Sequence, residues 1–227
     1  MDMAPVAAAW TPMQWALLVG MWWTMMVAMM APSAAPVVLL YARAQRHAVQ
    51  APAAGAAATA GGFAIPWPIA AFALGYAIAW LVFSLVAAAA QQLLQHRQWL
   101  SPSTMGVSFD WLSATMLIAA GAYQLSPLKG ACLSQCRSPA AFLARHWRPG
   151  ATGAIRLGLL HGAYCVGCCW LLMALLFVGG VMNPWWIVAL ALVVLAEKYL
   201  PAGQWLGRVL GLVLVGWGLL LVLPDTL

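Results

Sequence analysis

Residues 157–180 have the sequence LGLLHGAYCVGCCWLLMALLFVGG, an apolar run that contains no Asp, Glu, Lys or Arg. An α-helix needs about 20 mostly apolar residues to cross the roughly 30 Å of hydrocarbon in a bilayer. We therefore predict a membrane-spanning helix over residues 154–180. Its imidazole and three thiols stand out, because ionisable groups inside a membrane are costly and usually serve a function.

The whole chain shares this apolar character. Of its 227 residues 65% are hydrophobic and only 6% charged, whereas a soluble domain has about 25% charged residues. The formal net charge is +6, but the basic residues lie in the gaps between apolar runs. That distribution is typical of membrane topology rather than of nucleic-acid binding. The composition therefore excludes a soluble globular domain and predicts the lipid bilayer as the surroundings.

We predict an all-α fold, a polytopic transmembrane helical bundle of about six spans that forms one domain over residues 1–227. The expected spans lie at about residues 13–40, 66–95, 110–127, 154–180, 184–200 and 204–223. Residues 128–153 form the only sizeable polar segment and are expected to be a basic cytoplasmic loop. Part of this loop should lie along the inner membrane surface, since it also carries aromatic and apolar side chains.

The basic residues predict the orientation of the bundle. Nine of the ten Lys and Arg residues lie at the connections that follow the first, third and fifth expected spans, and Arg97 alone lies on the other side. Because basic residues are enriched on the cytoplasmic side of membrane proteins, we expect both the N- and the C-terminus outside the cytoplasm.

The fourth expected span carries the sharpest group of candidate ligands. At about 100° per residue, His161, Cys165 and Cys168 fall within about 60° of one another, and Cys169 lies about 40° beyond Cys165. Imidazole and thiolate suit zinc and copper, and thiolates in particular suit Cu(I). The alternative is that these cysteines only pack, since a free Cys behaves as a small buried hydrophobe. Three Cys in five positions beside a His favour metal or redox chemistry.

The first expected span contains five methionines in ten residues. Met21, Met25 and Met29 step by four and form one stripe, and Met26 and Met30 form a second. A thioether is a soft ligand that can hold Cu(I) weakly and release it. The alternative is packing, because Met fills irregular gaps at helix interfaces.

Three smaller patterns accompany these groups. Cys132 and Cys136 are one helical turn apart. The flanking Lys129 and Arg137 are expected to favour the thiolate forms of these cysteines. We interpret the pair as a soft-metal clamp; a redox pair and plain core cysteines are the alternatives. The adjacent Glu197 and Lys198 are expected to be a snorkelling pair at the end of the fifth span, and a proton or metal relay is the alternative. The glycines of the GLLHG sequence at 158–162 permit close approach of another helix.

Four segments resemble a bacterial family of predicted metal-binding integral membrane proteins, some of whose members are labelled copper chaperones. They are MWWTMMVAMMAPSAAP at 21–36, YQLSPLKGACLSQCRSP at 123–139, LGLLHGAYCVGCCW at 157–170 and LVVLAEKYLP at 192–201. The resemblance implies metal handling in a bacterial inner membrane. The motif residues map onto the following positions: Met25, Met26, Met29, Met30, Cys132, Cys136, His161, Cys165, Cys168 and Cys169.

Together these features predict a protein that binds a soft metal, Cu(I) above all, and transfers or transports it in the membrane. Zinc fits less well, since it prefers four closed N and S ligands and has no use for thioethers. A cuproprotein or a soluble copper carrier is the expected partner. We expect a binding protein rather than an enzyme; the alternatives are a membrane thiol oxidoreductase, a metal-dependent oxidase component, and a non-catalytic assembly or scaffold subunit.

Overall fold

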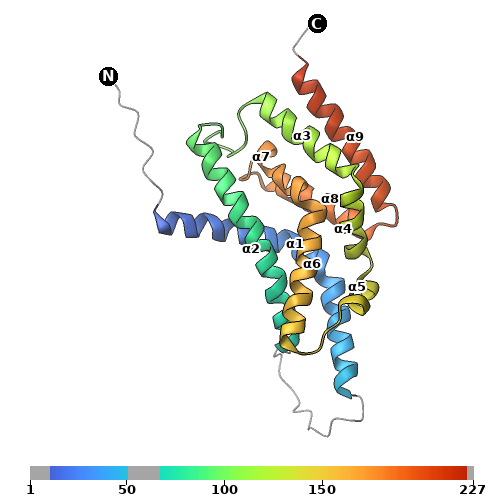
Figure 1. Cartoon of the computed structure of the whole chain (residues 1–227). Helices are drawn as coiled ribbons and strands as arrows, with labels where there is room; N and C mark the ends of the chain where they lie inside the picture. The colour runs from blue at the N-terminus through green and yellow to red at the C-terminus, as the bar shows by residue number, and fades with distance from the viewer. Residues whose placement is uncertain (1–10, 51–66, 224–227) are drawn as a thin grey trace.

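The computed structural model describes residues 11–50 and 67–223. Within these ranges the regular elements are helices, and the one β-type contact is an isolated bridge between Leu100 and Val107. The helices are α1 (Pro12–Gln50), α2 (Trp67–His96), α3 (Asp110–Gln124), α4 (Pro127–Arg137), α5 (Pro139–His146), α6 (Gly150–Ala174), α7 (Leu176–Gly179), α8 (Pro184–Tyr199) and α9 (Gly203–Val222). The expected all-α fold is confirmed for the part of the chain that is described (Figure 1).

Four segments are long and apolar enough to cross a membrane. They are residues Pro12–Arg46 in α1, α2, the combined stretch Gly150–Gly179 of α6 and α7, and α9. Helices α3 and α8 lie at the two remaining expected spans, but with only 15 and 16 residues they are shorter than the roughly 20 residues that a span needs. The stretch expected to be a basic loop contains α4 and α5, and α1 continues to Gln50 rather than ending near residue 40.

Glycines on α6 and α2 bring these two helices into close contact. A Cβ atom at Gly158 would overlap the carbonyl oxygen of Phe72, and one at Gly162 would lie 2.5 Å from the Cβ of Ala79. On α2, a Cβ atom at Gly75 would overlap the carbonyl oxygen of Ile155. The small residues expected to permit close approach therefore do so, and α2 is the helix that they contact.

Helix α1 bends near its middle, where Pro32 and Pro36 lie inside the helix (Figure 1). A proline has no N–H to donate and its ring displaces the carbonyl four residues earlier, so prolines kink helices. Pro36 leaves the carbonyl of Pro32 without its helical donor, and the hydroxyl of Tyr199 on α8 donates to that carbonyl at 2.7 Å. The bend brings Met30 and Ser33 against α6 and α8.

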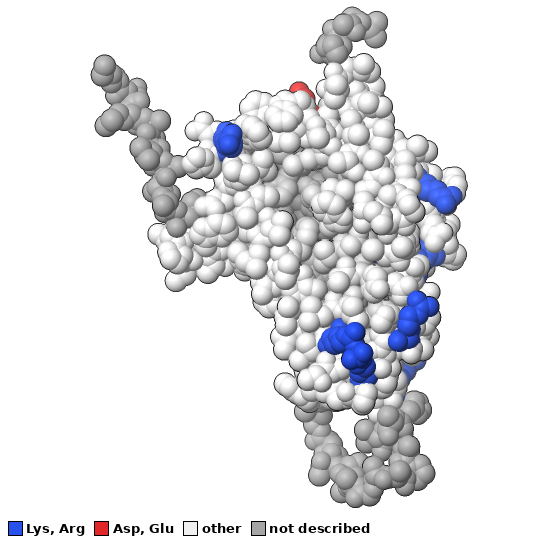
Figure 2. Space-filling model, in the orientation of Figure 1, with Lys and Arg blue, Asp and Glu red and all other residues white. Residues whose placement is uncertain are grey.

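Basic side chains are unevenly distributed over the surface. On the face drawn in Figure 2, most Lys and Arg atoms lie on the side where α5, the start of α6 and the start of α9 are found. One basic group lies at the opposite end, where α2 ends. This asymmetry agrees with the spacing of basic residues along the sequence.

Candidate metal centre

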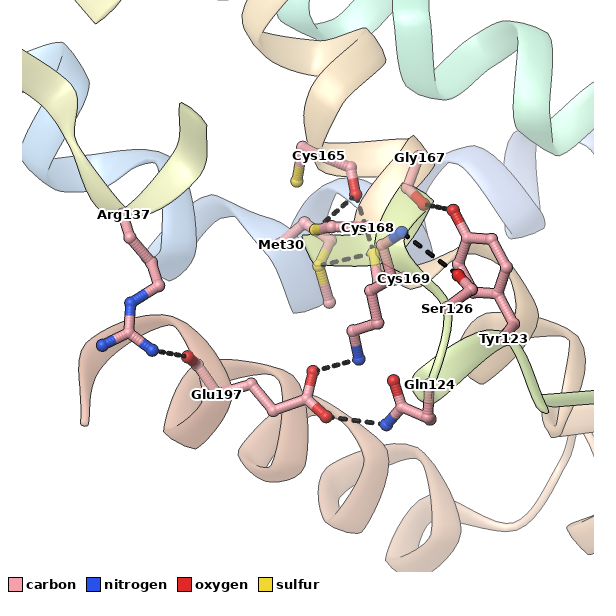
Figure 3. Close-up of polar contacts among 11 residues, drawn as sticks. Met30, Tyr123, Gln124, Ser126, Arg137, Cys165, Gly167, Cys168, Cys169 and Glu197 are labelled. Atoms are coloured by element: carbon pink, nitrogen blue, oxygen red, sulfur yellow. Dashed lines mark hydrogen bonds and ion pairs between the residues drawn. The ribbon is translucent and has the colours of Figure 1, made fainter. Parts of the chain in front are cut away.

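Three cysteines of α6 lie in the core of the molecule, next to the bend of α1. Cys165, Cys168 and Cys169 are all at most 2% exposed. The thiols of Cys168 and Cys169 donate to the carbonyl oxygen of Cys165 at 3.1 and 3.0 Å. The Cys169 sulfur also lies 4.0 Å from the thioether sulfur of Met30 (Figure 3). Sulfur atoms from two helices therefore meet in a buried place.

Helix α4 adds the other two cysteines to this place. Ser126 caps the N-terminus of α4: its hydroxyl accepts from the backbone N–H of Lys129 at 3.3 Å. Pro127 occupies the first helical position. The thiol of Cys136 lies close enough to that of Cys168 for the two to interact. Cys132 faces Gly167, where a Cβ atom would lie 3.0 Å from its sulfur. All five cysteines are free thiols, and α4 and α6 bring them together.

The expectation that Lys129 and Arg137 favour thiolates on α4 is wrong. Burial raises the pKa of Cys132 above its ordinary value, and the interaction with Cys168, together with burial, raises the pKa of Cys136 well above it. Lys129 instead donates to the carboxylate of Glu197. Arg137 donates to the backbone carbonyl of Glu197 in the last turn of α8 and to those of Leu200 and Pro201 just beyond it.

The methionines of α1 lie on the side of the helix that faces the same core, at different depths. Met26 and Met30 are fully buried and Met29 is 6% exposed, whereas Met21 and Met25 are partly buried and pack against the same hydrophobic cluster. Met30 is the one that contacts a cysteine sulfur among the described residues. Of the second expected stripe, Met30 therefore reaches the thiols.

His161 lies one turn before Cys165, among aromatic rings. It is 1% exposed, and its ring centroid lies 5.2 Å from that of Phe142, 6.0 Å from that of Tyr76 and 6.2 Å from that of Phe72. Its Nδ1 atom has no hydrogen-bond partner within the described part of the chain. Since buried polar atoms are nearly always paired, an unpaired imidazole nitrogen is a candidate ligand atom.

Glu197 and Lys198 do not form the snorkelling pair expected from the sequence. They are 1% and 8% exposed, and they have separate partners. Glu197 accepts from Lys129 at 2.5 Å and from Gln124 at 2.7 Å. The Lys198 ammonium donates to the Cys165 sulfur at 3.0 Å and to the Ser33 hydroxyl at 3.1 Å. Sequence reasoning thus missed Lys198 as a neighbour of the thiols, although its place at the end of an apolar run was a signal.

A family model described as PpoB2, copper chaperone, matches residues 19–221. The chain belongs to this family. The match confirms the resemblance found in the sequence, and it supports a function related to copper. Comparisons with curated proteins and with solved structures gave no match.

The donors in the core suit the copper that this family name implies. Thiols and thioethers are the soft ligands that select Cu(I). Two sulfurs that bind one ion through bonds of about 2.3 Å are separated by roughly 3.8–4.6 Å, and the sulfurs of Met30 and Cys169 are 4.0 Å apart. No three His, Cys, Asp or Glu side chains within residues 11–50 and 67–223 form a ready metal site. The thiols of Cys168 and Cys169 point to a backbone carbonyl, so they must rotate to share an ion.

Proposed function

We propose that this chain binds Cu(I) at the buried thiols and transfers it to a partner, a cuproprotein or a soluble copper carrier. The observation that carries this proposal is the meeting of three helices, in which α4 and α6 contribute five free thiols and α1 contributes the thioether of Met30. None of these sulfurs is part of a disulfide.

The roles follow from the depth of each donor. Cys165, Cys168 and Cys169 hold the ion, together with Met30 and the unpaired imidazole of His161. The partly buried Met21 and Met25, with Met26 and Met29, form a chain of weak thioether ligands along α1 by which the ion approaches or leaves. Cys132 and Cys136 on α4 exchange the ion at the basic end of the molecule.

The same donors favour Cu(I) over zinc. A structural zinc site closes four nitrogen or sulfur ligands around the ion and makes no use of thioethers. Cu(I) accepts thiolates and thioethers, so the nearness of Met30 to Cys169 is useful for copper and of no use for zinc.

The proposal includes a place in the bacterial inner membrane. Four helices have the length and hydropathy of membrane spans, and the shorter α3 and α8 would complete six spans if the bilayer is locally thinner around them. With the basic end of the molecule in the cytoplasm, both termini would lie outside.

Copper binding by the purified full-length chain tests this function. We expect about one Cu(I) per chain in competition with a Cu(I) chelator, and a loss of at least about tenfold in affinity after Met30→Leu or after the double change Cys168→Ser and Cys169→Ser. Serine offers a hard oxygen and leucine offers no lone pair, so each change removes soft ligands. Leucine has nearly the volume of methionine, and such swaps usually cost less than about 1.5 kcal/mol.

The matched control is Met116→Leu on α3, a partly buried methionine that packs against the same cluster. It should leave the affinity for Cu(I) unchanged. The proposal fails if the wild-type chain binds no Cu(I), or if Met30→Leu and the double cysteine variant bind it as tightly as Met116→Leu.

A further inference from the structure

Lys198 is a buried cation that has no carboxylate partner within residues 11–50 and 67–223. Its ammonium contacts the Cys165 sulfur at 3.0 Å and the Ser33 hydroxyl at 3.1 Å. The neighbouring Glu197 carboxylate is engaged by Lys129 and Gln124. The other acidic residue in the described part of the chain, Asp110, is exposed at the start of α3.

The positive charge of Lys198 therefore has to be balanced by the buried cysteine sulfurs of α6. A buried charge without a partner costs several kcal/mol, whereas a paired and hydrogen-bonded one is tolerated. The sulfur of Cys165 is the group in contact with Lys198 that can carry a negative charge. The hydroxyl of Tyr76 lies 3.3 Å from the same sulfur and donates to the carbonyl oxygen of Met30 at 3.2 Å.

A metal ion on Cys165 would lie close to the ammonium of Lys198. With a metal–sulfur bond of about 2.3 Å and 3.0 Å from sulfur to nitrogen, the two cations would be separated by roughly 5 Å at most. Their repulsion is proportional to the charge on the metal ion. A divalent ion is therefore repelled twice as strongly as a monovalent ion at the same position.

We propose that Lys198 determines the specificity of this centre by favouring a monovalent over a divalent soft metal ion. The inference rests on the proposed function, because it takes the buried cysteines of α6 to be the copper site. Removing the charge would weaken the stabilisation of the Cys165 thiolate for both kinds of ion, so that contribution cancels in the ratio of their affinities. The repulsion does not cancel, because it differs between the two ions.

The experiment measures the affinities of the purified full-length chain for Cu(I) and Zn(II) in wild-type and variant proteins. Lys198→Gln removes the charge and keeps a polar side chain, Lys198→Leu removes both, and Lys198→Arg keeps the charge. Two unit charges about 5 Å apart in a protein environment interact strongly enough to change a binding ratio more than tenfold. We expect the ratio of Cu(I) to Zn(II) affinity to fall at least about tenfold in the Gln and Leu variants and by less than about threefold in the Arg variant.

Arg97→Gln is the control, since it removes one positive charge from an exposed position just beyond α2. It should leave the ratio unchanged. An unchanged ratio in Lys198→Gln, or in Lys198→Leu if the Gln variant does not fold, overturns the role of Lys198; so does an equal fall in Lys198→Arg. If the wild-type chain binds no Cu(I), the proposed function fails instead, so the two failures are distinguishable.

Discussion

The ion pair between Lys129 and Glu197 connects α4, which carries two of the cysteines, to α8. Its nitrogen and oxygen are 2.5 Å apart, and the two side chains are 3% and 2% exposed. Glu197→Gln removes the negative charge and leaves the ammonium of Lys129 buried without its partner. The amide oxygen keeps the shape of the carboxylate and can still accept from Gln124, which donates to Glu197 at 2.7 Å in the native chain. The variant therefore isolates the effect of the charge.

Breaking a buried ion pair by removing one partner costs about 3–5 kcal/mol, because the remaining charge is uncompensated. We expect Glu197→Gln to lower the free energy of unfolding by that amount, measured by reversible unfolding of the purified chain in mixed micelles. The double variant Glu197→Gln with Lys129→Met removes both charges, and replacing a buried pair by neutral groups is often close to neutral. It should be more stable than Glu197→Gln alone by at least about 2 kcal/mol.

Asp110→Asn supplies the matched control for the loss of a carboxylate. Asp110 is exposed in the first turn of α3, where a negative charge stabilises a helix by only about 0.3–1 kcal/mol. If Glu197→Gln costs no more than Asp110→Asn, or if the double variant is less stable than Glu197→Gln, the ion pair does not hold α4 in place and the reasoning is refuted.

Three further predictions concern packing, thiol chemistry and topology. Gly158→Ala should destabilise the chain by about 1–3 kcal/mol or more, because the added Cβ would overlap the carbonyl oxygen of Phe72. The control Gly130→Ala on α4, where nothing lies within 4 Å, should stabilise the chain by up to about 1 kcal/mol. Equal free energies of unfolding for the two variants would contradict this packing. The raised pKa of Cys132 leaves less reactive thiolate at neutral pH. Alkylation of Cys132, followed by peptide mass spectrometry, should therefore reach half of its maximal rate above pH about 8.5, the midpoint for a free cysteine. A midpoint below that pH would show that the thiolate is stabilised. Reporter fusions after Ala140 and at the C-terminus should report opposite sides of the membrane, and the same side for both would exclude the proposed six-span topology.

Much of the local structure could be predicted from the sequence, because it depends on neighbours along the chain. Long apolar runs without charges form helices in a bilayer, since every backbone group must be satisfied internally there. The helical period places Cys132 and Cys136 on one face of α4 and separates the two methionine stripes of α1. The glycines at 158 and 162 indicate a face of close approach, but they do not identify the helix that packs there.

The partners across helices were decided by the tertiary structure. The helical period relates residues within one helix, but it does not determine how that helix is rotated against its neighbours. Contact of Gly158 with Phe72 and the bend at Pro32 and Pro36 set those rotations. They bring Met30 to Cys169.

The same packing separates Glu197 from Lys198, which the sequence presents as a pair. Adjacent residues on a helix point about 100° apart, so each can be buried against a different helix. Glu197 meets Lys129, and Lys198 meets Cys165. The sequence by itself determined that this chain is helical, apolar and rich in soft ligands; the packing of α4, α6 and α8 decided which charge lies beside the thiols, because a buried charge is held by whichever partner the neighbouring helices bring to it.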